Sequence, residues 1–77
     1  MKKVKLIWDF FGDDAQKTAE HHAIHLEEFC KKENFSFFES GTESSPDITI
    51  AFLTVEETNM ILVRDTLRPK RGEWVTD

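Results

Sequence analysis

Three histidines lie within one short segment of this 77-residue chain, and imidazole is the side chain best suited to proton transfer or metal binding near neutral pH. His21 and His25 are four residues apart. In a helix they stand one turn apart on the same side, a spacing at which two imidazoles can bind zinc. No glutamate lies between them as in the zincin motif, and Cys30 lies too far round the helix to be an assured third ligand. We therefore predict no metal and no cofactor, with His21 and His25 as the candidate ligands if a metal binds.

His22 falls in the middle of the apolar arc that a helix would form here, where a hydrogen-bonded histidine of the core or of an interface is the commoner role. An alternative is acid or base catalysis by His22 or His25. Asp9 would orient such a ring only if the fold brings the two groups within reach. No complete catalytic set is visible, so we favour a protein without catalytic activity and keep these three residues as candidates.

The charge balance and the single cysteine exclude several classes of partner. The chain has 10 basic and 15 acidic side chains, and this net negative charge argues against binding to nucleic acid or anionic lipid. Cys30 alone can form neither an intramolecular disulfide nor a cysteine-only zinc site. No apolar stretch approaches the roughly 20 residues of a membrane span. We expect a cytoplasmic protein without a nucleic-acid or membrane partner.

The charges are unevenly distributed along the chain. Residues 33–63 carry six acidic side chains and no Lys or Arg, whereas the last fourteen residues carry four basic and three acidic side chains. A solvated acidic face with a few cations near a helix end explains this pattern. The alternative explanation is head-to-tail charge complementarity in a dimer.

The elements that must position these side chains are expected within one domain, residues 1–77, because no repeat or long linker divides the chain. Apolar alternation, turn residues and capping signals predict the order strand, helix, strand, strand, helix, strand. Asp13, with Gln16 as its reciprocal partner, is the expected N-cap of the first helix. A capping box over residues 54–57 favours a helix for the second helical segment, although a buried strand is an alternative there. The expected ranges are 3–11, 14–32, 35–40, 47–54, 55–67 and 73–75, with a polar loop at 41–46.

This order is typical of an α+β, ferredoxin-like two-layer sandwich, with two helices on one face of an antiparallel sheet. Trp8 and Phe10 are expected on the face that packs against the helices. The opposite face would then expose several large apolar side chains, and such a patch usually marks an interface. We therefore predict a homodimer packed sheet to sheet. The residues expected at its interface are Ile7, Phe11, Phe38, Ala51 and Leu53.

The segment from Ala19 to Phe29, with its His25-Leu26 pair, is followed by a strand, a polar loop and the run Ile48 to Glu57. This arrangement resembles the dimeric α+β barrel proteins, which include the YCII-like and antibiotic-monooxygenase-like families. The chain is shorter than these proteins and lacks the glycines usual around their second strand. The resemblance implies a sheet-to-sheet dimer and a small-molecule pocket between helix and sheet, lined by His22, His25 and Trp8.

These observations lead to one principal hypothesis and two alternatives. The principal hypothesis is a homodimeric binding or regulatory module without chemistry of its own. The first alternative is an enzyme or small-ligand binder of the dimeric barrel type that uses His22 or His25 as acid or base. The second alternative is a metal-binding protein that uses His21 and His25.

Overall fold

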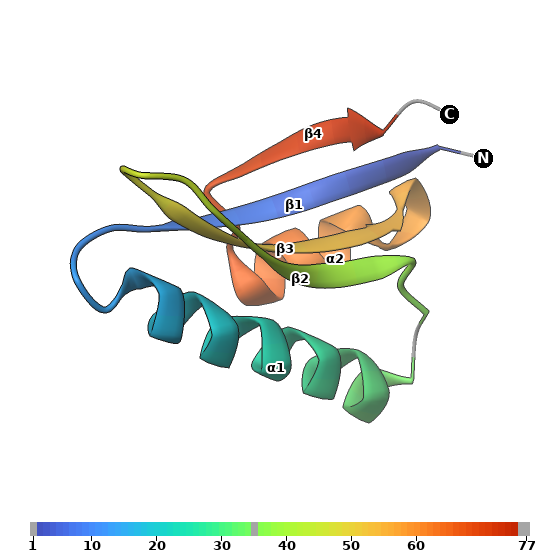
Figure 1. Ribbon diagram of the computed structural model, residues 1–77. Coiled ribbons are helices and arrows are strands. Elements are labelled where there is room, and N and C mark those ends of the chain that lie inside the picture. The colour runs from blue at the N-terminus through green and yellow to red at the C-terminus, as the bar shows by residue number, and fades with distance from the viewer. Residues whose placement is uncertain (1, 35, 76–77) are drawn as a thin grey trace.

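The computed structural model describes residues 2–34 and 36–75, which form four strands and two helices (Figure 1). The elements follow the expected order of strand, helix, strand, strand, helix and strand. Their bounds are β1 (Lys3–Phe10), α1 (Ala15–Glu33), β2 (Glu39–Ser44), β3 (Thr49–Glu56), α2 (Glu57–Leu67) and β4 (Arg71–Val75).

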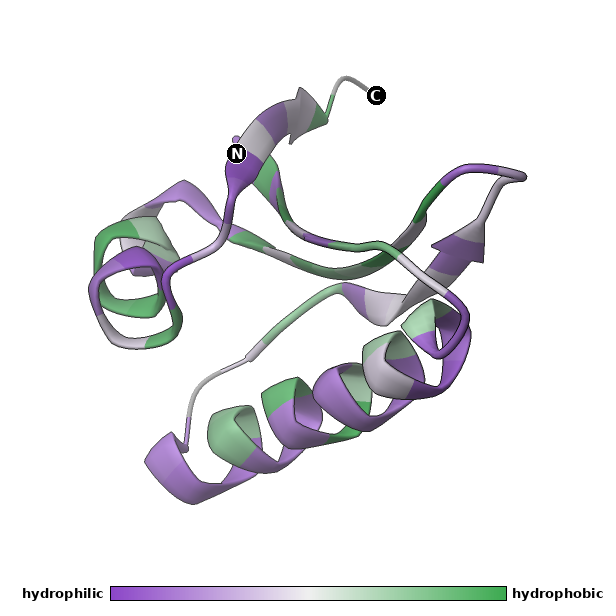
Figure 2. Ribbon diagram, turned by 90° about the vertical axis from the view of Figure 1, so that its left-hand side faces the viewer, coloured by the Kyte–Doolittle hydropathy of each residue, from purple (hydrophilic) through white to green (hydrophobic). Residues whose placement is uncertain are grey.

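The four strands form a single antiparallel sheet in the order β2-β3-β1-β4. β1 pairs along its whole length with β3, from Lys3 opposite Glu56 to Phe10 opposite Thr49. β2 and β4 are the edge strands, and each pairs with only one neighbour. Both helices lie on the same side of the sheet (Figures 1 and 2). This confirms the α+β class, with two helices against a four-stranded antiparallel sheet.

The core lies between the helices and one face of β1 and β3, because alternate residues of a strand point to the same face. Trp8 also ties α2 to the sheet, since its indole Nε1 donates a hydrogen bond to the carbonyl oxygen of Leu67 at 2.9 Å. The fully or nearly fully buried core residues are Val4, Leu6, Trp8, Ala19, Ala23, Leu26, Cys30, Ala51, Leu53, Val55 and Val63.

The expected orientation of β3 is wrong, because Ala51 and Leu53 face the helices and not the opposite face of the sheet. Both residues are completely buried in the core. The pairing with β1 explains their orientation, since directly opposed residues of antiparallel strands point to the same face. Leu53 lies opposite Leu6, and Ala51 lies opposite Trp8. Both sides of β3 are apolar, so alternation within this strand alone could not distinguish them.

α1 agrees closely with the predicted helix, but its N-terminal cap differs. The N-cap residue is Asp14 and not Asp13, and its side chain makes no capping hydrogen bond. Gln16 instead donates to Glu20 one turn further along the helix, at 3.3 Å. The helix ends at Asn34, which adopts the left-handed conformation with φ 62° that favours a C-terminal cap. Small residues on the buried side of α1 let it approach the sheet closely.

The second strand was expected at 35–40 and the polar loop at 41–46, and both predictions are wrong. β2 spans Glu39–Ser44, so it covers the last two residues of the expected strand and the first four of the expected loop, and Phe35 lies outside the described residues. β2 is an edge strand held by its backbone pairing with β3, and none of its residues is fully buried. A strand of this kind needs no apolar alternation, so the pattern that indicates a strand is absent. The turn closes at Ser45, whose N–H donates to the carbonyl oxygen of Ile48 at 2.8 Å.

The helix predicted for the second helical segment is confirmed, but the capping box is not formed. Thr54 is buried within β3, and α2 begins after Glu56, whose side chain makes no capping hydrogen bond. α2 ends at Arg68, which is left-handed with φ 49° and precedes Pro69. β4 then begins at Arg71, two residues before the expected last strand.

The orientation of β3 can be tested by truncating Leu53. Leu53→Ala should lower the free energy of unfolding by about 2 to 5 kcal/mol, because it leaves a cavity in a fully buried position. Leu62→Ala removes the same atoms from an exposed position of α2 and should change the free energy of unfolding by no more than ~0.5 kcal/mol. Urea unfolding measures both values. Equal small losses for the two variants would contradict the assignment of Leu53 to the core.

Candidate functional site

A groove lies between α2 and β4 on the side of the sheet that carries the helices. Its cavity volume is about 300 Å³, which is at the lower end of the range for small-ligand sites. We call it the α2–β4 groove. It is lined by Val4, Leu6, Met60, Arg64, Pro69, Lys70, Arg71, Gly72 and Trp74.

The groove exists because α2 packs against β1 and β3 and leaves the underside of β4 uncovered. Every residue of β4 is exposed. Trp74 lies opposite Val4, so its ring projects toward the helix side, yet 59% of Trp74 remains accessible to solvent. Gly72 lies opposite Leu6 and has no side chain to fill the space between the strand and α2. An open apolar surface with an exposed indole therefore borders the sheet edge.

The polar lining of the groove is cationic. Arg64 and Lys70 border it, and no acidic residue is among its lining residues, although acidic side chains outnumber basic ones in the chain. Lys2 adds a third cation, with its Nζ 5.9 Å from the centre of the Trp74 ring. Such a site suits a ligand with an apolar or aromatic body and an anionic group.

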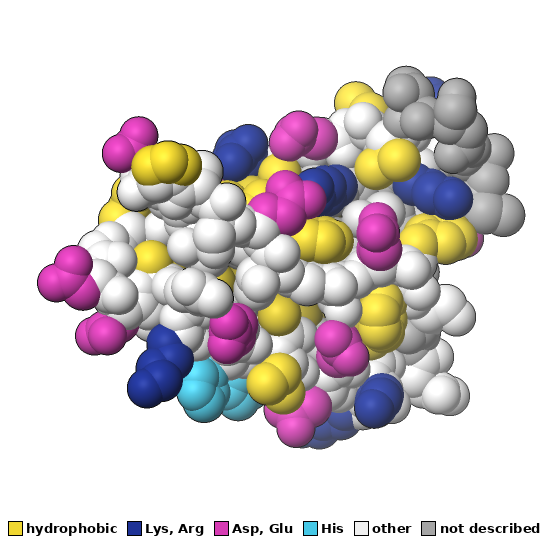
Figure 3. Space-filling view, in the orientation of Figure 1, with side chains coloured by type: hydrophobic (Ala, Val, Ile, Leu, Met, Phe, Trp, Pro, Cys, Tyr) yellow, Lys and Arg dark blue, Asp and Glu magenta, His cyan; other side chains and the backbone are white. Residues whose placement is uncertain are grey.

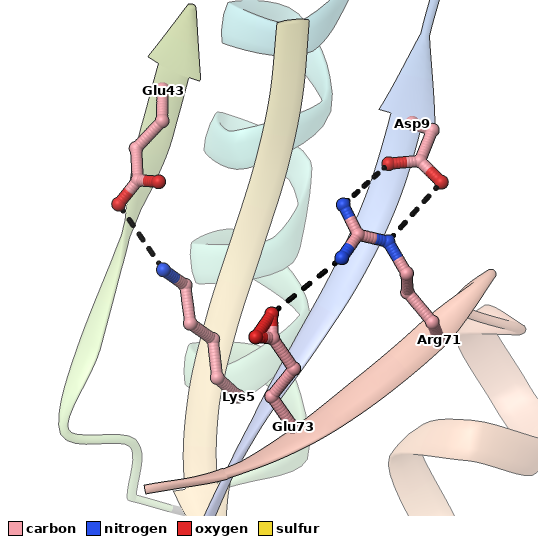
Figure 4. Close-up of polar contacts among 5 residues, drawn as sticks. All are labelled: Lys5, Asp9, Glu43, Arg71 and Glu73. Carbon is pink, nitrogen blue, oxygen red and sulfur yellow. Dashed lines mark hydrogen bonds and ion pairs between the residues drawn. The ribbon is translucent and has the colours of Figure 1, made fainter.

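The opposite face of the sheet, which carries no helix, also contains apolar side chains, but they are covered. Ile7, Ile50 and Phe52 form a small cluster there, and Ile7 is only 1% exposed. The aliphatic part of Lys5 lies across this cluster, with its Nζ 4.4 Å from the centre of the Phe52 ring and 3.1 Å from Glu43 Oε1 (Figure 4). Long charged side chains commonly cover apolar surface in this way.

On the same helix-free face, the side chain of Arg71 lies over the part of the sheet next to β4 (Figure 4). Its Nη2 donates to Asp9 Oδ1 at 3.1 Å, and its Nη1 lies 3.5 Å from Glu73 Oε1. The hydrogen bond to Asp9 is the main cause of a raised pKa for Arg71. Since this side chain belongs to the helix-free face, the charge of Arg71 does not face the α2–β4 groove.

The residues expected at a sheet-to-sheet interface are therefore dispersed. Ile7 lies on the helix-free face but is buried under charged side chains. Phe11 follows β1 and is exposed, and Phe38 is exposed before β2 with the Lys3 Nζ 4.5 Å from its ring centre. Ala51 and Leu53 belong to the core on the opposite side of the sheet. These five residues form no common apolar surface.

His22 lies in the apolar contact between α1 and β1, as its position on the helix predicts. Its ring centre is 5.0 Å from that of Trp8 and 5.6 Å from that of Phe10. Its Nε2 is buried and has no hydrogen-bond partner among the described residues, so the expected hydrogen bond is not found there. Burial, together with the charge of His25, lowers the pKa of His22 below the ordinary value of 6.5. His22 therefore packs against two aromatic side chains in an environment that favours the neutral form of its ring.

The other candidate residues are not brought together with His22 into a site. His25 is exposed on α1, with its Nδ1 3.5 Å from Glu28 Oε1, and histidine side chains are visible on the surface over α1 in Figure 3. Asp9 points to the helix-free face and pairs with Arg71, so it cannot orient a histidine across the sheet. His21 is exposed. Within residues 2–34 and 36–75, no cluster of three or more His, Cys, Asp or Glu side chains could hold a metal ion.

Cys30 is a buried core residue on α1, as expected from its position near the end of the apolar arc. Burial raises the pKa of its thiol, and the nearby Glu27 acts in the same direction. The thiolate is the reactive form of cysteine, so this thiol is protected from oxidation and alkylation in the folded protein.

No protein-family model matches the chain, and no curated protein and no solved structure matches it either. Among the described residues, neither helix has the length and apolar character needed to cross a membrane.

The α2–β4 groove was not predicted from the sequence, although two signals point toward it. Four of the ten basic residues fall within the last fourteen positions, and Trp74 lies among them in a short strand. These signals could be combined only with the knowledge that α2 covers β1 and β3 and leaves β4 uncovered.

The lowered pKa of His22 predicts a pH dependence of stability. The folded protein protonates His22 at a lower pH than the unfolded chain does. The stabilisation from the neutral ring is therefore present above the ordinary pKa of 6.5 and is lost as the pH falls through the lower folded value.

His22→Gln should remove this contribution and flatten the loss of unfolding free energy between about pH 7.5 and about pH 5, measured by urea unfolding. His21→Gln, at the adjacent exposed position, is the matched control and should keep the wild-type pH dependence. If both variants lose stability on acidification as the wild type does, His22 does not carry this pH dependence.

Proposed function

We propose that this protein is a homodimeric binding module of ferredoxin-like fold, without chemistry of its own, which takes an anionic, partly apolar ligand in the α2–β4 groove. The observation that carries this proposal is the groove itself, with apolar walls, an exposed indole and a cationic border. The described residues contribute no acid, base or nucleophile to this groove besides Arg64 and Lys70, whose charges suit binding rather than proton transfer.

The order of the strands supports the ferredoxin-like assignment. β1 and β2 flank β3, while β3 and β4 flank β1, and all three pairs of neighbours are antiparallel. Each helix therefore connects two strands that run in the same direction and are separated by one strand. Two such interleaved strand-helix-strand units define the split βαβ arrangement.

The nature of the ligand follows from the lining of the groove. Val4, Leu6 and Met60 provide apolar walls, and Trp74 offers an aromatic surface for stacking. Arg64 provides a planar, permanently charged guanidinium that suits a carboxylate, sulfonate or phosphate group. An aromatic or aliphatic acid, or an acidic side chain beside an apolar one in a peptide, would satisfy both parts of the groove.

The histidines do not enter this proposal. A role in acid-base catalysis requires a ring that reaches both a substrate and an orienting group. His22 is packed between Trp8, Phe10 and the rest of α1, and His25 is exposed away from Asp9. The packing of Trp8 against His22 occupies the position at which the resemblance to the dimeric barrels implies a pocket.

The binding site can be tested with 8-anilinonaphthalene-1-sulfonate, an aromatic probe with one sulfonate group, whose emission rises in an apolar environment. The wild-type protein should bind it at the groove. Arg64→Gln should weaken binding by roughly threefold to tenfold, because an exposed charge-assisted contact is lost. Trp74→Ala should weaken binding further and reduce the quenching of indole fluorescence on titration, because only the buried Trp8 then remains.

Arg68→Gln is the matched control for this titration, since it removes an exposed arginine that does not line the groove. This variant should bind the probe as the wild type does. Binding that is unchanged in both Arg64→Gln and Trp74→Ala would contradict the assignment of the groove as the ligand site.

A further inference from the structure

β4 is an open edge of the sheet. It pairs with β1 on one side only, and all five of its residues are exposed. An edge strand presents backbone N–H and C=O groups that can pair with another chain. β4 is not protected by a covering helix, because α2 packs against β1 and β3. The strand is therefore available to a second extended segment.

We propose that β4 of a second copy occupies this edge, antiparallel to the first, with Gly72 on the two-fold axis. This inference rests on the proposed homodimer and identifies the interface as the edge of the sheet and not its face. The two sheets then join into one sheet of eight strands. A two-fold axis perpendicular to the sheet keeps all four helices on the same side, so paired residues must point to the same face.

The side chains of β4 are self-complementary about Gly72. With Gly72 opposite Gly72, Arg71 lies opposite Glu73 of the second copy, and the same ion pair repeats on the other side of the axis. Both side chains are about half exposed and project from the helix-free face. On the helix side, Lys70 lies beside Trp74 of the second copy, an arrangement that favours a cation–π contact. Opposite charges on directly facing residues stabilise an antiparallel pair.

Other registers of the β4 pair, and the pairing of β2 with its own copy, lack this complementarity. Placing Glu73 on the axis sets two carboxylates opposite each other, and placing Trp74 there sets Glu73 opposite Val75, which leaves this carboxylate without a basic side chain opposite it. At the other edge of the sheet, pairing of β2 about Gly41 sets Glu39 opposite Glu43 of the second copy. Like charges on facing residues are destabilising, so β4 is the edge that attracts its own copy.

The dimer would extend the ligand site. The two α2–β4 grooves lie under neighbouring central strands of the joined sheet, with Trp74 and Lys70 of each copy beside the axis. A single channel bounded by both α2 helices would result, and each groove would gain a basic residue from the other copy.

Pairing of five residues per chain gives a small interface, so we expect dissociation in the micromolar range and weaker association at high salt.

The test uses sedimentation velocity of the full chain at several concentrations and at low salt. Glu73→Arg places Arg71 opposite an arginine, and Arg71→Glu places Glu73 opposite a glutamate, so each variant alone should be monomeric. An equimolar mixture of the two restores both ion pairs across the axis and should sediment as a dimer. Glu33→Arg makes the same change of charge at an exposed position of α1 and should dimerise as the wild type does. Circular dichroism checks that each variant is folded.

The outcomes separate this inference from the proposal on which it rests. A wild-type dimer, monomeric single variants and a dimeric mixture support pairing through β4. A wild-type dimer that persists in Glu73→Arg overturns the β4 interface and leaves the homodimer in place. A wild-type protein that stays monomeric over the whole concentration range at low salt overturns both.

Discussion

The pairing of β1 with β3 is the constraint on which the remainder of the structure depends. These two central strands are paired over eight residues each, and their register decides which side chains share a face. Leu6 and Leu53 are directly opposed and face the helices, while Ile7 and Phe52 are opposed and face the other way. A shift of one residue would exchange the two faces of one strand, so this register is fixed by the burial of the core.

The two faces of the sheet are covered in different ways. Helices cover one face, and Trp8 anchors the end of α2 to it through the hydrogen bond to Leu67. On the other face, Lys5 and Arg71 cover a small apolar cluster and pair with Glu43, Asp9 and Glu73. A second sheet packed on this face would have to remove these charges from water, which is costly even for paired groups. The uncovered underside and open edge of β4 offer a surface without that cost.

The predictability of this structure varies with the strength of the local signal. α1 was predicted well because its small and apolar residues repeat at helical spacing and Asn34 supplies a C-terminal cap. β2 was missed because an edge strand with polar side chains depends on backbone pairing and leaves no apolar pattern. Ala51 and Leu53 were assigned to the wrong face because β3 is apolar on both sides, and its orientation comes from its pairing with β1.

The features of the candidate site also differ in whether a local sequence pattern predicts them. The position of His22 in the helix–sheet contact follows from the helical wheel, since that position falls in the apolar arc. The separation of Asp9 from His22 does not, because it depends on the face to which each residue of β1 points. The α2–β4 groove joins residues from the first strand and from the last quarter of the chain. Their proximity is a consequence of strand order, and no local pattern encodes it.

The most direct measurement of the central claim, that β4 is the edge through which the protein pairs with itself, is disulfide formation in Gly72→Cys under mild oxidation. Residues directly opposed in an antiparallel pair have Cα atoms roughly 4.5 to 5.5 Å apart, within the range that a disulfide spans. A Cβ at Gly72 meets Leu6 at 3.4 Å, an ordinary contact, and the buried Cys30 does not compete.

Thr42→Cys, on the same side of the opposite edge strand, is the control. The account predicts a rapid covalent dimer for Gly72→Cys and a free thiol for Thr42→Cys. A Gly72→Cys protein that remains a monomeric thiol at concentrations where the wild type is dimeric would contradict it.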